Sequence, residues 1–133
     1  MKKLLLLIFC LTFSFHVMAS DASKEKPVQH LKIADVTSMK DAKKIFIEKT
    51  SEIKSKKKLD QMELQQIHTI TYSLEKSTAY FVENLKGDRQ ELAKEIAVVV
   101  EDIHISSENS RQLKTETLLN KYFTMAEKFI SGF

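Results

Sequence analysis

The sequence is poor in the residues that cross-link or interrupt small proteins. Its 133 residues include only one cysteine, two glycines and one proline, and no tryptophan. The single cysteine, Cys10, falls in an apolar N-terminal stretch that we expect to be removed, so disulfides are not expected to hold the fold. The scarcity of glycine and proline favours long, uninterrupted helices over a fold rich in turns.

The N-terminus has the pattern of a secretory signal peptide. Lys2 and Lys3 precede a nearly continuous apolar stretch at residues 4–15, and Ala19 suits the last position before a cleavage site. The apolar stretch is shorter than the roughly 20 residues that cross a membrane as a helix. We therefore predict a signal peptide at residues 1–19, export to the periplasm, and no transmembrane anchor after cleavage. A retained anchor is the alternative.

Little net charge remains after that cleavage. Removal of Lys2 and Lys3 lowers the 21 basic residues to 19, against 18 acidic ones, which leaves a formal charge of +1. A near-neutral chain gives no electrostatic reason to expect a nucleic-acid partner. The remaining chain has the length of a single domain with one modest core.

Capping signals divide the rest of the chain into an arm and four helices. Residues 20–37 are polar and predict an extended arm, whereas residues 38–133 predict a helical bundle. At three places a capping side chain stands three residues before a carboxylate: Ser38 with Asp41, Asp60 with Glu63, and Asp88 with Glu91. Gly87 marks a helix stop, because glycine adopts the left-handed conformation at low cost. The predicted helices span residues 39–57, 61–86, 89–107 and 111–131.

Apolar residues within these segments recur at intervals of three and four. Ile67, Ile70 and Leu74 are one example, and the spacing places such residues on one face of a helix. The connections between the segments are short, so neighbouring helices must run antiparallel. The sequence therefore predicts an all-α fold, an up-down antiparallel four-helix bundle preceded by the signal peptide and the arm.

Polar residues lie beside the apolar faces of the second and third predicted helices. Those of the second helix have i, i+4, i+7 spacing, and those of the third flank a histidine: His68, Tyr72 and Glu75, then Glu101, His104 and Glu108. The turn at Gly87 brings His68 and His104 to within ~4 Å of each other along the bundle axis. The two histidines both point into the groove between the helices or both point away from it, and the sequence leaves either open.

These residues fall in two stretches that resemble a known family. The stretches His68 to Glu75 and Glu101 to Glu108 are similar to signature stretches of small exported helical proteins from proteobacteria, a family known only as a domain of unknown function. His30-Leu31-Lys32 resembles the His-aromatic-Lys segment near the start of its members, with leucine in place of the aromatic residue. The resemblance covers most of the chain after the signal peptide, with departures in the lysine-rich end of the first helix and in the fourth helix. It implies the same fold and compartment, and no assigned activity.

Two interpretations of these polar residues compete. In the first they form a hydrogen-bonded layer that holds the two helices in one register, at some cost in stability. The members of that layer are His68, Tyr72, Glu75, Glu101 and His104. The protein is then a non-enzymatic binding or structural protein of the bacterial envelope, with no cofactor and with an unidentified partner, for which an envelope protein is one candidate.

In the second interpretation the polar residues bind a metal ion. Imidazoles and carboxylates in one layer suit zinc, copper(II) or iron. The candidate ligands are His68, Glu75, Glu101, His104, Glu108 and, from the arm, His30. The second helix lacks a Glu-x-x-His motif, so an oxygen-activating di-iron enzyme is not expected. Haem held by a methionine and a histidine, and catalysis by Ser107 beside His104, have weaker support.

Overall fold

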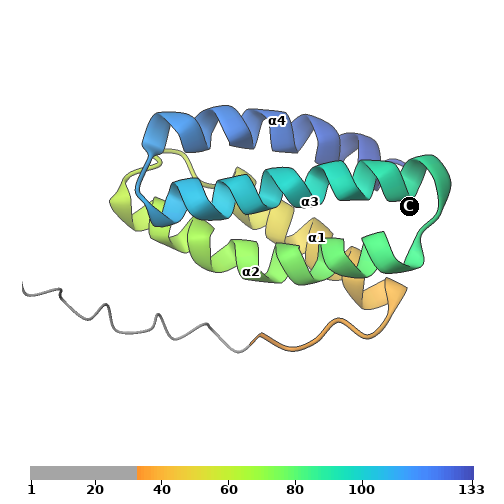
Figure 1. Cartoon of the computed structure of the whole chain (residues 1–133). Helices are drawn as coiled ribbons and strands as arrows, with labels where there is room; N and C mark the ends of the chain where they lie inside the picture. The colour runs from red at the N-terminus through yellow and green to blue at the C-terminus, as the bar shows by residue number, and fades with distance from the viewer. Residues whose placement is uncertain (1–32) are drawn as a thin grey trace, which may run out of the picture.

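Four α-helices arranged as an up-down bundle account for most of the described chain. The structure is a computed structural model, and it describes residues 33–133. The helices are α1 (Met39–Lys54), α2 (Gln61–Asn84), α3 (Gly87–Glu108) and α4 (Gln112–Ile130). Each helix packs against the next in the chain, and α4 closes the bundle by contacting α1 (Figure 1). Residues 33–133 contain no strand, so the predicted all-α four-helix bundle is confirmed.

The N-terminal arm is described only over its last residues. The predicted signal peptide at residues 1–19 and the arm as far as residue 32 lie outside the described residues. The Lys76 side chain of α2 donates a hydrogen bond of 2.7 Å to the carbonyl of Ile33 and pairs with Asp35 at 2.6 Å, which holds this end of the arm against α2. Within residues 33–133, no helix has the length and apolar character needed to cross a membrane.

Two of the three predicted helix caps are present. Ser38 Oγ accepts a hydrogen bond from the backbone N–H of Asp41 at 3.1 Å. Asp60 Oδ1 accepts one from the backbone N–H of Glu63 at 2.9 Å. Each bond satisfies an N–H group of the first turn that has no partner inside its helix. The capping signals therefore locate the starts of α1 and α2.

The connection between α2 and α3 is only two residues long. α2 ends at Asn84, two residues before its predicted end, and Leu85 and Lys86 are extended. Gly87 has a φ of +62°, the left-handed conformation predicted for it, but it is the first residue of α3 and not the residue that directly follows α2. The prediction that Asp88 caps the third helix is wrong: α3 already begins at Gly87, and Asp88 lies in its first turn, where a negative charge suits the helix dipole. So short a connection fixes how α2 and α3 are aligned along their lengths.

The loop between α1 and α2 is held by a carboxylate of α2. Glu63 Oε2 accepts hydrogen bonds from the backbone N–H groups of Lys58 and Leu59, each 2.7 Å long. Leu59 has a φ of +48°, a left-handed conformation that is unfavourable for a residue with a Cβ. The two hydrogen bonds offset that cost. α1 consequently ends at Lys54, three residues before its predicted end at residue 57.

The centre of the bundle is an aromatic cluster from α1, α2 and α4. The rings of Phe46, Phe81 and Phe129 meet edge to face, with centres 4.9 to 5.7 Å apart, and all three are buried. Beside them, Thr50 Oγ1 and Tyr122 OH form a buried hydrogen bond of 2.6 Å. Burial raises the pKa of the Tyr122 phenol, which therefore stays neutral. Outside this aromatic cluster, polar side chains of α2 and α3 meet along the line of contact between those two helices, which we call the groove.

Replacing Glu63 with glutamine should weaken the fold in a pH-dependent way. Burial acts to raise the pKa of Glu63, but hydrogen bonds from Leu59, Lys58 and Lys57 outweigh it and hold the pKa below its usual value. The stability from this carboxylate is therefore present above its unfolded-state pKa and is lost as the pH falls through its lower folded-state pKa. Glu63→Gln should lower the urea midpoint at neutral pH, and the deficit should shrink below about pH 4.

The matched control is Glu116→Gln, an exposed glutamate of α4 that takes no part in the loop between α1 and α2. Its urea midpoint should equal that of the wild-type protein at both pH values. An equal deficit for Glu63→Gln at neutral and acid pH would show that the charge of Glu63 does not stabilise the loop.

Candidate metal centre between α2 and α3

The groove between α2 and α3 brings together the polar residues singled out in the sequence. The ring centres of His68 and His104 are 4.7 Å apart. The ring of Tyr72 is centred 4.8 Å from that of His104 and 5.2 Å from that of His68. Of the two orientations that the sequence left open, the structure has the one in which both histidines point toward each other. The short connection between the helices produces this alignment.

Each histidine has a hydrogen-bond partner on α2. His68 Nε2 and Tyr72 OH lie 3.1 Å apart, one turn along the same helix. His104 Nδ1 and Glu75 Oε1 lie 2.5 Å apart and join α3 to α2. An ionised carboxylate can only accept, so this bond assigns a hydrogen to Nδ1 and leaves Nε2 as the ring nitrogen that Glu75 does not use. Glu75 therefore orients His104 so that Nε2 can bind a ligand.

The groove is partly shielded from solvent. His68 is 9% exposed, and the side chains of His104 and Glu75 are 15% and 30% exposed. Thr71 and Ser107 are buried, and their hydroxyls donate to the backbone carbonyls of His68 and His104 at 2.6 and 3.0 Å. Ser107 is thus bonded to its own helix, which argues against a role as a nucleophile. Sequence reasoning did not single out the hydroxyl of Thr71, because nothing in its spacing separates it from core residues.

Acidic residues surround the phenol of Tyr72. Burial raises the pKa of Tyr72, and the negative charges of Glu108 and Glu75 raise it further. The phenol is therefore neutral in the metal-free protein. The same carboxylates would attract a cation placed in the groove.

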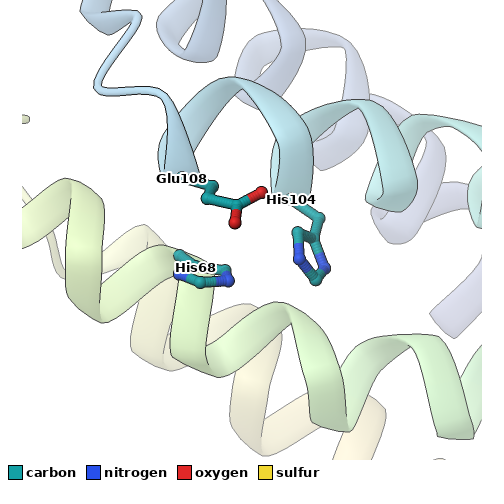
Figure 2. A group of neighbouring side chains, drawn as sticks. All are labelled: His68, His104 and Glu108. Atoms are coloured by element: carbon teal, nitrogen blue, oxygen red, sulfur yellow. The ribbon is translucent and has the colours of Figure 1, made fainter. Parts of the chain in front are cut away.

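Glu108 completes a set of three metal-ligating groups. Figure 2 shows its carboxylate, at the end of α3, turned toward the rings of His68 and His104. One ligand atom from each of these residues lies within 4.8 Å of the others. Glu75, Glu101 and His104 form a second set within the same limit, so His104 belongs to both sets. Glu101 and Glu108 are exposed and lie about one turn before and after His104.

This donor set suits a transition-metal ion. Zinc binds imidazole nitrogen and carboxylate oxygen at ~2.0–2.2 Å, so two donors on one ion lie about 3–4 Å apart. The donor atoms of His68, His104 and Glu108 lie within 4.8 Å of one another, slightly more than this spacing, and Glu108 is exposed. His104 would bind through Nε2, with Glu75 behind Nδ1 as the carboxylate partner that metal-binding histidines commonly have. His30, the remaining predicted ligand, lies outside the described residues.

Comparison with known proteins identifies a family but no characterised relative. A family model matches residues 1–131, and its description is Family of unknown function (DUF6746). No curated protein and no solved structure matches the chain. The matched residues include the whole of α2 and α3, and therefore every residue of the groove.

Removing the Glu75 carboxylate should destabilise the bundle through His104. A hydrogen bond to a charged group contributes about 1.5–3 kcal/mol, and partial exposure of this pair reduces the effect. We expect Glu75→Ala to lower the free energy of unfolding of the metal-free protein by roughly 1–2 kcal/mol, measured by chemical denaturation. Glu83→Ala, an exposed glutamate further along α2, is the control and should cost less than about 0.5 kcal/mol. An equal loss in the free energy of unfolding for Glu75→Ala and Glu83→Ala would show that the bond does not stabilise the fold.

Proposed function

The chain belongs to this family of unknown function, and we propose that it is an exported, non-enzymatic protein that binds a transition-metal ion between α2 and α3. The alternative is that the same residues form only a structural polar layer. His68 already has Tyr72 as a partner, and His104 has Glu75. A structural layer is therefore complete without Glu108, whereas a metal site needs the third donor that Glu108 supplies.

The observation that carries the proposal is the convergence of His68, His104 and Glu108. Two imidazoles bound to one ion, each through a nitrogen ~2 Å from it, have ring centres about 5 Å apart. The observed separation is 4.7 Å. Packed aromatic rings have a similar spacing, but ring packing gives no reason for a carboxylate to be directed at both rings (Figure 2).

The charges in the groove also favour a cation. Glu75, Glu101 and Glu108 all lie within reach of His104. Carboxylates held near one another repel, and a bound cation removes that repulsion. Because two of the donors are imidazoles, the site suits zinc, copper(II) or iron better than magnesium or calcium, which prefer oxygen ligands.

Export is supported by the sequence. Residues 1–19 have the basic start, the apolar stretch and the small terminal residue of a signal peptide. We propose that the protein acts in the periplasm, where an envelope protein is its candidate partner. The proposal includes no reaction, and Ser107 beside His104 is buried and bonded to the backbone of α3.

The metal proposal predicts that protein purified from its own compartment carries about one transition-metal ion per chain. Plasma mass spectrometry of untagged protein measures the content of zinc, copper and iron. His68→Ala/His104→Ala should lose the ion, because two of the three donors are removed. Glu91→Ala/Glu116→Ala changes two exposed glutamates outside the groove and should retain it. The polar layer would be the correct interpretation if the wild-type protein carried no metal and the double histidine variant differed only by a lower melting temperature.

The export proposal predicts that the periplasmic fraction contains a chain that begins at Ser20. N-terminal sequencing or intact mass measurement of that fraction tests this. Substituting Ala19 with a bulky residue such as phenylalanine should block cleavage there and leave the longer precursor, because the position before the cut accepts only small residues. Recovery of the full-length chain in the cytoplasm alone would contradict the proposal.

A further inference from the structure

Tyr72 lies beside the proposed ligands, although the sequence predicted it as a member of the polar layer and not as a metal ligand. Its hydroxyl is 3.1 Å from Nε2 of His68, and its ring centre is 4.8 Å from that of His104. Atoms that bind the same ion at ~2 Å from it are about 3 Å apart from each other. The separation of the hydroxyl and Nε2 is therefore that of two ligands on one ion, as well as that of a hydrogen bond.

We propose that Tyr72 binds the metal ion as a phenolate, and that this ligand makes the groove selective for ferric iron over zinc. The inference rests on the proposed metal site. A phenolate and the Glu108 carboxylate together give the ion two anionic oxygens beside the nitrogens of His68 and His104. Attraction to anionic oxygen grows with the charge of the ion, so a trivalent ion gains more from this set than a divalent one.

The ligation step is an acid–base exchange. The O–H bond of Tyr72 breaks, the oxygen–iron bond forms, and the proton leaves to solvent, to which Tyr72 is partly exposed. A bound cation favours the anionic form of its ligands. No electron is transferred, because the iron is supplied in the ferric state. His68 exchanges its hydrogen bond with the phenol for a bond to the same ion.

The other two tyrosines are placed for different roles. Tyr122 is buried in the core and bonded to Thr50. Tyr80 lies two turns beyond Tyr72 on α2 and packs against the core at the far end of the helix from His68. Tyr80 is therefore a matched control, being a partly buried tyrosine on the same helix and outside the groove.

Visible absorption spectroscopy tests the inference, since a ferric ion bound to a phenolate has a charge-transfer band that zinc and unligated iron lack. The apo protein is titrated with ferric nitrilotriacetate and, separately, with zinc chloride. Wild type and Tyr80→Phe should develop the band, with tyrosinate vibrations in the resonance Raman spectrum. Tyr72→Phe should lack the band and bind ferric iron about 10–100-fold more weakly, while its zinc affinity changes less than about threefold.

Tyr72→His, a second variant, keeps a ligand at the same position without the phenol. It should bind metal without the charge-transfer band, so loss of the band cannot be attributed to misfolding. Zinc binding by the wild-type protein without a ferric band would overturn the role of Tyr72 and leave the metal site standing. A charge-transfer band that persists in Tyr72→Phe would also overturn the role of Tyr72. Failure of both zinc and iron to bind would overturn the metal site itself.

Discussion

The candidate metal centre depends on the two-residue connection between α2 and α3. Leu85 and Lys86 are extended, and Gly87 turns the chain with a positive φ, so α3 can start at only one level beside α2. That alignment sets His104 between His68 and Glu75 along the groove. A shift of one helical turn, ~5.4 Å, would separate the histidines and break the bond to Glu75. Any function of the groove therefore requires the turn to hold α3 at this level beside α2.

The aromatic residues that stabilise the bundle and the candidate metal ligands lie in different parts of the fold. Its aromatic core is formed by α1, α2 and α4, where Phe46, Phe81 and Phe129 exclude water and Tyr122 is kept neutral. The polar groove lies between α2 and α3, where burial is incomplete and both histidines have hydrogen-bond partners. A well-packed core restricts the motion of the helices. The packed core therefore helps to hold the groove residues near one another, in addition to the bond between Glu75 and His104.

Much of the fold follows from local sequence, and the exceptions have physical causes. Ser38 and Asp60 were predictable as caps because capping depends on residues three apart. Asp88 does not act as a cap, because α3 begins at Gly87, two residues before its predicted start, and Asp88 lies inside the helix. The end of α1 was misplaced because Glu63, from the next helix, holds the loop, and helix propensity does not reveal such a contact. The end of a helix thus depends on hydrogen-bond partners that can come from another helix, as Glu63 does here.

The same distinction applies to the candidate site. The spacing of His68, Tyr72 and Glu75 predicts one row on α2, and the register with His104 follows from the turn. Which way the two rows face depends on the packing of α1 and α4, and periodicity within one helix does not contain that information. The partner of His104, Glu75, could be named from the sequence only as a member of the layer. The bond between them is a result of tertiary packing.

All residues of the groove belong to one α-hairpin that is continuous in sequence, from Gln61 to Glu108. Bringing its two halves together closes only a short loop, so the entropy lost is small compared with that of contacts between α1 and α4. The groove can therefore assemble from a nascent chain while the fourth helix is still being synthesised. The aromatic core would then close around a hairpin whose alignment had already been settled.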